Sequence, residues 1–332
     1  MKKERIIDIV LVVLVLIFIG AFAVMEGAFR SYTSPESDAA LTDWMGAIDD
    51  GTSIARINIP GTHSSGARFC YPSYLLSNQD LTIGDQLLVG CRYLDIRVGL
   101  QGDELILFNN FGKCRTSANP FSEKIRFAAV IEDVLQFLDA HPSETVIVAI
   151  KTENEKDDAA KVQTGIQEIV SAHEDRFYTE NHLPNLGLVR GKIILARRYD
   201  DVVHAGEKGG MHLEWKDQGG REPAASPFTV RDVNDSLVVA VQDRYRYTVQ
   251  DKWNAFEYTL TNCPANQWTI SINFLSTMTG SGIPHPRAYA EELNTLFLEK
   301  ELEQGKMYGI LAFDFMTQEM AEKIIASNSS GQ

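Results

Sequence analysis

The segment TVIVAIK, residues 145–151, is a short run of apolar, mostly β-branched residues that ends on a lysine. Its side chains are apolar at both alternating positions, as expected of a strand that is covered on both faces of a parallel sheet. The fold class therefore depends on how often such a run recurs along the chain.

Seven further runs share this pattern, and helical patterns at 122–140, 156–172, 287–303 and 317–327 lie among them. Eight strands with intervening helices predict an α/β fold, namely a single distorted TIM-type (β/α) barrel. A Gly-rich stretch at 203–228 is long enough to predict a functional loop. The seven runs are ARINI (55–59), CRYLDIRV (91–98), ELILFN (104–109), KIILARR (192–198), LVVAVQD (237–243), WTISINF (268–274) and YGILAFD (308–314).

The start of the chain indicates export. Three basic residues precede an uninterrupted apolar run at 9–24, and AFA at 21–23 has the small-x-small pattern of a signal-peptidase site. The same run is nearly long enough to span a bilayer, which leaves an uncleaved anchor as the alternative. We expect a signal peptide or membrane anchor at 1–29, a linker at 30–42 and the barrel at 43–328. The protein would then be secreted or held at the outer face of the cell membrane.

Charge and cysteine content exclude several functions. The net charge of −14 disfavours nucleic-acid partners and strongly anionic membrane surfaces, although a local basic pocket can lie within such a field. Export makes the four cysteines candidates for disulfides, with Cys70–Cys114 as the expected pair. For Cys91, in an apolar strand, an unpaired buried thiol is the alternative to a disulfide. The sequence has no CxxC or Cys/His cluster, and we expect neither a metal nor another cofactor. We also expect the protein to be a monomer.

Polar side chains follow the ends of the predicted strands. Taken singly, each has a structural explanation as a buried histidine or a salt-bridge partner, but the C-terminal ends of barrel strands converge on one face. Three cationic groups suit a phosphate, a strand-end carboxylate could accept hydrogen bonds from hydroxyls, and a tyrosine could stack on an apolar ring face. A histidine oriented by a carboxylate is a general base. The pattern predicts a metal-free site for a polyol phosphate ester, built from His63, Asp95, Arg97, Lys151, Arg198, Asp243, Tyr245 and Asp314.

Seven ordered blocks between residues 43 and 315 resemble the bacterial phosphatidylinositol-specific phospholipases C of the X-domain type. They are INIPGTH, CRYLDIRV, HPSETVIVAIKTE, GKIILARRY, VQDRY, INFLS and GILAFDF. The resemblance implies a distorted TIM barrel, export, and cleavage of phosphatidylinositol in the membrane to diacylglycerol and inositol 1,2-cyclic phosphate. It also implies contact with the membrane surface.

The resemblance assigns roles by position. His63 matches the general base, Asp314 the carboxylate that orients it, and Arg97 the phosphate-binding arginine, with Asp95 counted beside them as catalytic. The inositol-binding wall corresponds to Lys151, Arg198, Asp243 and Tyr245, joined less securely by Trp215, Asp217 and Ser276.

The chain departs from the family at the general acid. The family motif reads Pro-Gly-Thr-His-Asp, and its Asp pairs with a second histidine that protonates the leaving oxygen. Here the Asp is Ser64, and Asn109 or Asn110 stands where that histidine belongs. Lys113, Arg115, His204 and His212 are the remaining candidates for a donor.

Three functions therefore stay open. The chain could be a slowed phosphodiester-cleaving lyase, or a catalytically inactive exported protein that binds inositol lipids or glycolipids. A glycerophosphodiester phosphodiesterase would need metal-binding carboxylates near the first histidine and a His-Arg-Gly opening, and the sequence has neither. Separately, the apolar residues of CYPSYLLSN (70–78) could form a lip on the rim of the site or pack a short helix onto the barrel.

Overall fold

The computed structural model describes residues 10–18, 20, 33–203, 209–278 and 285–328. Residues 10–18 are helical with exposed side chains, and no helix in the described ranges is both long and apolar enough to cross a membrane. Much of the predicted leader and the start of the predicted linker lie outside the described residues. The folded body begins with α2 (Ala39–Thr42), where Leu41 is buried.

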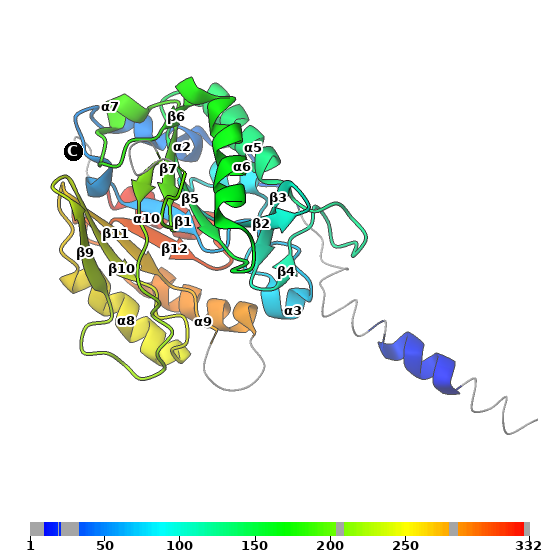
Figure 1. Ribbon diagram of the computed structural model, residues 1–332. Coiled ribbons are helices and arrows are strands. Elements are labelled where there is room, and N and C mark those ends of the chain that lie inside the picture. Colours follow the sequence, from blue (N-terminus) through cyan, green and yellow to red (C-terminus); the bar gives the residue numbers. More distant parts are fainter. Residues whose placement is uncertain (1–9, 19, 21–32, 204–208, 279–284, 329–332) are drawn as a thin grey trace, which may run out of the picture.

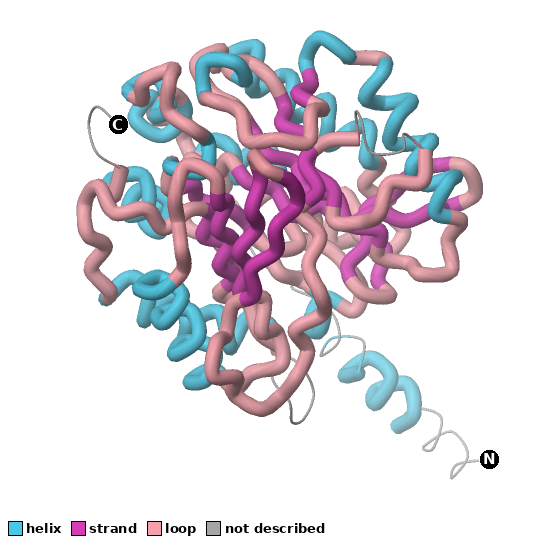
Figure 2. Tube along the Cα trace, turned by 60° about the vertical axis from the view of Figure 1, so that its left-hand side comes forward, coloured by secondary structure: helices cyan, strands magenta, loops and turns pink. Residues whose placement is uncertain are grey.

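A single sheet forms the centre of the molecule, with helices on its outer side (Figures 1 and 2). Along the path β6-β7-β5-β2-β1-β12-β11-β10 every neighbouring pair is parallel. The antiparallel strand β9 ends this path, and no ladder joins the two edges in the described residues. The predicted distorted TIM-type barrel is thus confirmed, as an open one.

The strands are short, as is usual for a barrel. Their bounds are β1 Ile59–Thr62, β2 Tyr93–Gln101, β3 Glu104–Asn109, β4 Gly112–Lys113, β5 Val146–Thr152, β6 Phe177–Tyr178, β7 Ile193–Arg197, β8 Met211–His212, β9 Thr229–Asn234, β10 Leu237–Gln242, β11 Thr269–Phe274 and β12 Ile310–Phe313.

Side-chain caps define where several helices begin. Asp158 accepts from the Lys161 amide before α6, and Thr82 forms a capping box with Asp85 before α4. The remaining helices are α3 Ser73–Leu76, α4 Ile83–Leu88, α5 Phe127–Ala140, α6 Ala159–Ser171, α7 Leu186–Val189, α8 Val249–Asn262, α9 Pro286–Glu299 and α10 Gln318–Ala326, with short 3₁₀ turns η1 Trp44–Ala47, η2 Ile54–Arg56 and η3 Glu174–Arg176.

Alternate residues of each barrel strand point to opposite faces. In β5, Ile147 and Ala149 pack in the barrel interior, whereas Val148 and Ile150 pack outward in the cluster that contains α5 and α6. A third cluster joins β12 to α8, α9 and α10. The barrel interior is therefore a filled core at its base, and only the strand ends are free to form a site.

Several predicted elements need correction. The run 104–109 is not a barrel strand, because β3 pairs antiparallel with β2 and forms a hairpin with β4. Only Ile59 of the run 55–59 is in a strand, because the turn η2 ends at Arg56 and β1 begins at Ile59. Helix α8 went unpredicted because its buried face includes Lys252 and Thr259, which interrupt the apolar stripe.

The cysteine pairing is confirmed. Cys70 and Cys114 form a disulfide, and Cys91 is a buried free thiol whose pKa burial raises to about 12. The predicted long loop at 203–228 contains the short strand β8, and its residues 204–208, including His204, lie outside the described residues.

Candidate active site

A pocket of about 600 Å³ opens at the C-terminal ends of the barrel strands. It collects most of the residues that the sequence predicts for the site, which come from β1, β2, β5, β7, β10, β11, β12 and the loops after them. Those lining it are His63, Arg97, Lys151, Arg198, Trp215, Asp217, Asp243, Tyr245, Ser276 and Asp314, with Asn109 and Asn110 on one wall.

Strand alternation explains why these side chains converge. Most of them continue the inward-facing set of a strand in steps of two residues. Lys151 follows Ile147 and Ala149 in this way, and Asp314 follows Ile310 and Ala312. The same inward positions therefore build an apolar core low in the barrel and a polar site at its rim.

His63 and Asp314 form the base half of the site. His63 Nδ1 lies 2.6 Å from Asp314 Oδ1, and Arg97 Nη2 lies 2.8 Å from His63 Nε2. Since an arginine only donates, Nε2 is the accepting nitrogen and the Nδ1 hydrogen faces Asp314. Gln79 holds the two strands together by donating to the carbonyls of His63 and Phe313, at 2.8 and 2.9 Å.

Asp95 lies beneath the pocket and does not line it. One of its oxygens accepts from Arg198 Nη1 at 2.6 Å, and the other accepts from the Ser64 amide at 3.0 Å and lies 3.4 Å from Arg97 Nε. Burial alone would raise the pKa of Asp95, but Arg97 and Arg198 hold it well below its usual range. This buried carboxylate fixes two arginines rather than facing a ligand.

Glu153 is a site residue that the predicted set lacks. Its carboxylate lies 3.1 Å from Arg97 Nη1 and 3.0 Å from Lys151 Nζ. Against the effect of burial, these two cations lower the pKa of Glu153 to about 2. Burial and the neighbouring Arg97 lower the pKa of Lys151. The signal was present in the sequence, since Glu153 is the next inward position after Lys151.

The opposite wall is aromatic and polar. The Arg198 guanidinium stacks 3.8 Å over the Trp215 ring, and the Trp215 indole donates to Asp243 at 3.2 Å. Tyr245 donates to Asp217 at 2.6 Å. The buried Ser276 hydroxyl lines the pocket and has no hydrogen-bond partner among the described residues. Such a group is suited to a ligand hydroxyl.

The other half of the site is a neutral pair. Ser64 Oγ donates to Asn109 Oδ1 at 3.1 Å, and the Asn109 amide donates to the Leu76 carbonyl at 2.7 Å and to Asn78 Oδ1 at 2.5 Å. Every hydrogen-bonding atom of the Asn109 amide group is thus engaged within the protein. Ser64 has a φ of 44°, a left-handed conformation that Asp and Asn tolerate better than Ser.

The other candidate donors lie elsewhere. Asn110 is exposed, and its backbone N–H donates to the Glu153 carboxylate. Lys113 contacts Gln101, Arg115 contacts the Ser122 carbonyl, and His212 lies 3.3 Å from Glu214. Lys113, Arg115 and His212 are absent from the pocket lining, so Asn109 is the residue that faces Ser64.

One group of potential metal ligands occurs in the described residues, formed by Asp200, His212 and Glu214. Burial and the neighbouring Arg197 and Arg231 lower the pKa of His212. The same two arginines would repel a cation, so this cluster has the electrostatics of an ion-pair network rather than of a metal centre.

Comparison with known proteins finds similar sequences and folds. Residues 71–199 match the model of the phosphatidylinositol-specific phospholipase C X domain. A 1-phosphatidylinositol phosphodiesterase of Staphylococcus aureus is 27% identical over 82% of this chain and 83% of its own length. One from Listeria monocytogenes is 26% identical over 91% and 90%. The solved structure of a double mutant of the S. aureus enzyme superimposes with a TM-score of 0.72 at 23% identity, covering 89% of this chain and 99% of the other.

An α/β barrel with a histidine–aspartate pair and three cationic side chains at its rim defines a class of phosphate-ester sites. Within that class, this chain is similar to the bacterial phosphatidylinositol-specific phospholipases C, and its residues 71–199 match their X domain.

Proposed function

We propose that this protein is a metal-independent lyase that cleaves phosphatidylinositol, or a related inositol lipid, into diacylglycerol and inositol 1,2-cyclic phosphate. The observation that carries the proposal is His63, with Nδ1 2.6 Å from Asp314 and Nε2 2.8 Å from Arg97. An unprotonated Nε2 that lies beside a fixed guanidinium suits a base that acts next to a phosphate.

In the proposed reaction, His63 Nε2 takes the proton from the inositol 2-hydroxyl. The resulting alkoxide attacks phosphorus and closes the cyclic ester, while the bond from phosphorus to the diacylglycerol oxygen breaks. Arg97 stabilises the charge that develops on the phosphate oxygens, and Asp314 stabilises the imidazolium. Asp95 and Glu153 position Arg97 for this role.

The wall of the pocket is proposed to recognise the inositol ring. Asp243 and Asp217 accept hydrogen bonds from ring hydroxyls, and Ser276 supplies a free hydroxyl. Tyr245 covers an apolar face of the ring, while Lys151 and Arg198 complete the positive side near the phosphate. We propose that the barrel acts outside the cell, with residues 1–29 as a signal peptide or membrane anchor.

The neutral Ser64–Asn109 pair limits the proposed activity. Neither side chain is an acid near neutral pH, so the leaving oxygen takes its proton from water. General acid catalysis typically contributes about 10²- to 10⁴-fold in rate, and cleavage of the natural lipid should be slower by a factor of this size. The same pair favours the second candidate function, an inactive protein that binds inositol lipids.

The direct test is release of diacylglycerol from phosphatidylinositol vesicles by the full chain with EDTA present. We expect slow release that the His63→Ala variant loses. His141→Ala is the matched control, because His141 pairs with Asp43 at 3.0 Å and is absent from the pocket lining. No release, combined with calorimetric binding of myo-inositol 1-phosphate, would favour the binding protein.

A further inference from the structure

Two phenylalanines in the segment 110–126 are exposed to solvent. Phe121 is 92% exposed and Phe111 is 67% exposed, and outside the helix of residues 10–18 they are the most exposed large apolar side chains among the described residues. Phe111 is in the turn between β3 and β4, and Phe121 is in the loop that follows β4 (Figure 1). Exposed aromatic side chains of this size mark an interaction surface when other features support one.

The loop of Phe121 is internally hydrogen-bonded. The Phe121 amide donates to Asn119 Oδ1 at 2.9 Å, and the Thr116 amide donates to the Glu123 carbonyl at 3.0 Å. Arg115 and Lys124 form an antiparallel bridge at the base of the loop. A loop whose backbone groups are already paired can enter a membrane interface at a lower cost in desolvation.

The segment 110–126 is also fixed to the rim of the pocket. Asn109 and Asn110 line the pocket directly before Phe111, and the Cys70–Cys114 disulfide ties the segment to the chain before α3. At Gly112 the backbone approaches α3 so closely that a Cβ atom would lie 2.5 Å from Leu76 Cδ1. Leu76 itself lines the pocket, so the turn that contains Phe111 packs against the pocket wall.

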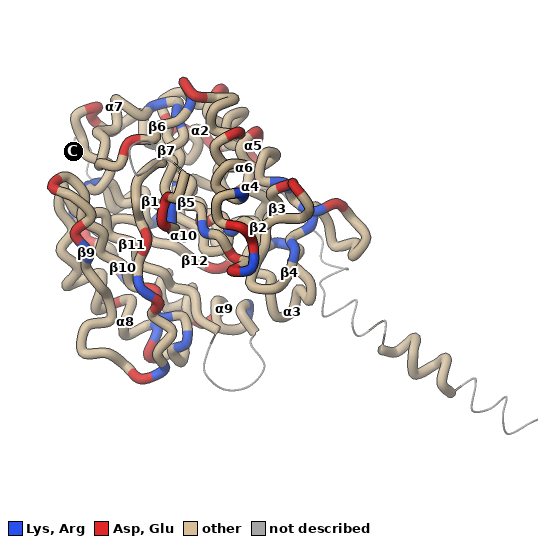
Figure 3. The backbone as a smooth tube through the Cα atoms, viewed as in Figure 1, with Lys and Arg blue, Asp and Glu red and all other residues tan. Residues whose placement is uncertain are grey.

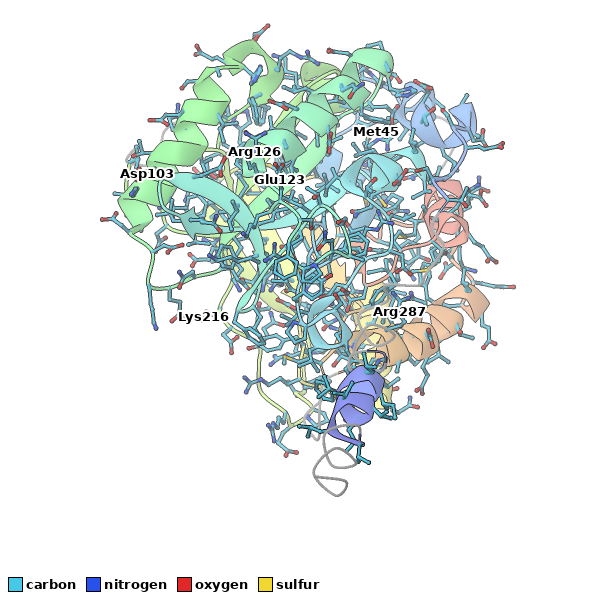
Figure 4. All side chains as sticks on the ribbon, turned by 90° about the vertical axis from the view of Figure 1, so that its right-hand side faces the viewer. Met45, Asp103, Glu123, Arg126, Lys216 and Arg287 are labelled. Carbon is cyan, nitrogen blue, oxygen red and sulfur yellow. A yellow bond between two sulfur atoms is a disulfide. The ribbon has the colours of Figure 1, made fainter. Side chains whose placement is uncertain are left out.

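The charge of this segment is opposite to that of the molecule. It carries four basic side chains and one acidic side chain in a chain of net charge −14. Figure 3 shows blue positions around β3 and β4, and Figure 4 looks onto this side of the molecule, where Glu123 and Arg126 are labelled. The basic residues are Lys113, Arg115, Lys124 and Arg126.

We propose that the segment 110–126 docks on a bilayer that contains anionic lipid, with Phe111 and Phe121 inserted among the headgroups and the four basic residues above them. Aromatic side chains are favoured at this depth, and basic residues are attracted by anionic lipid. The inference rests on the proposed function in that a docked rim brings a membrane lipid to the pocket.

The first test places a tryptophan at the proposed contact. The full-length Phe121→Trp variant is mixed with vesicles of phosphatidylcholine and phosphatidylglycerol whose acyl chains carry bromine. Its tryptophan fluorescence is measured, and the fluorescence of the wild type under the same conditions is subtracted. We expect quenching of the added tryptophan. Leu188→Trp is the matched control, because Leu188 is 57% exposed on α7, far from β4 in Figure 1. Equal quenching at the two positions, or none at position 121, would overturn the inference.

The second test removes the apolar contact. The Phe111→Ser/Phe121→Ser variant should bind vesicles about tenfold more weakly or worse, because each phenylalanine loses its transfer from water. Raising the salt concentration should weaken wild-type binding further, since salt screens the basic residues. Leu188→Ser should bind as wild type does.

These vesicles contain no inositol lipid, so neither test depends on catalysis. Quenching at position 121 without any lyase activity would support the docking surface and reject the proposed function. If the wild type has lyase activity but the Phe111→Ser/Phe121→Ser variant binds vesicles as the wild type does, the proposed function would be supported and the docking surface rejected.

Discussion

The two halves of the pocket differ in the kind of pair that each contains. On one side, His63 and Asp314 form an ionisable pair that opens toward the pocket and contacts Arg97. On the other side, Ser64 and Asn109 form a neutral pair that is hydrogen-bonded inward to Asn78 and Leu76. Both halves are hydrogen-bonded, but only the first has a proton acceptor that faces a ligand.

This contrast explains why the two residues of a buried acid pair are expected to be replaced together. Ser64 and Asn109 are 2% and 6% exposed. A lone carboxylate or a lone histidine at such a site would leave a buried polar group without its partner, which destabilises the fold. Replacement of both by a serine and an asparagine keeps the site hydrogen-bonded while it removes the acid.

The largest effect is expected in the base half. Asp314→Asn removes the charge that stabilises the imidazolium and lets the His63 ring adopt the wrong tautomer, and it should lower kcat about 10³- to 10⁴-fold. Steady-state cleavage of phosphatidylinositol in detergent micelles measures this. A loss of less than about tenfold would mean that Asp314 does not orient the base.

Arg97, which contacts His63, should show the next largest effect. Arg97→Lys keeps a positive charge but cannot contact Glu153, Asp95 and a phosphate together, because an ammonium lacks the planar fork. We expect kcat to fall about 10²- to 10³-fold. Binding of myo-inositol 1-phosphate, measured by calorimetry, should fall as well, and unchanged binding would place the phosphate elsewhere.

Restoring an acid at the positions of Ser64 and Asn109 should raise kcat, whereas the two substitutions above lower it. The Ser64→Asp/Asn109→His variant should cleave the lipid about 10²-fold faster than wild type, because it regains a proton donor for the leaving oxygen. Either substitution alone should give no gain, since the new group then lacks its partner. A double variant that folds, as circular dichroism would show, yet is no faster would reject the proposed role of this position.

The smallest effect concerns a buried lysine near the base half. Lys252 is fully buried in α8 and donates to Gln242 at 2.8 Å, and burial lowers its pKa to about 7. Between about pH 7 and pH 10 the unfolded chain holds the proton that the folded chain lacks, so this group makes the protein more stable as pH rises. Lys252→Met should raise the free energy of unfolding by about 1 to 4 kcal/mol at pH 6.

Denaturant unfolding at pH 6 and pH 9 checks this prediction. The gain from Lys252→Met should be smaller at pH 9, where the folded wild type has already lost the proton. A gain that is equal at both values would show that the ammonium is not destabilised by its burial.

Much of the fold and the site was predictable because both depend on strand alternation. Apolar runs that end on Arg97, Lys151 and Asp314 indicate buried strands and also indicate which side chains reach the rim. The chain direction of β3 was not predictable, since the run at 104–109 is as apolar as a barrel strand. Helix α8 was missed because Lys252 faces inward.

The contacts between distant loops could not be predicted from the sequence either. Gln79 joins β1 to β12, and Asn78 accepts from Asn109, yet neither residue stands in a motif or a periodic pattern. Glu153 is different, because the alternation in β5 predicts its inward position. Sequence patterns thus identify side chains that continue a strand, while polar contacts from loops require the folded structure.

If the His63–Asp314 pair still acts as a base and the Ser64–Asn109 pair no longer supplies an acid, the rate of cleavage must depend strongly on the leaving group. The wild-type chain is assayed on phosphatidylinositol and on the 4-nitrophenyl ester of myo-inositol 1-phosphate, whose phenolate leaves without needing a proton. We expect kcat for the nitrophenyl ester to exceed that for the lipid by about 10²-fold or more, and we expect His63→Ala to lose both activities. Equal kcat values for the two substrates would contradict this expectation, because they would show that a proton donor still serves the leaving oxygen.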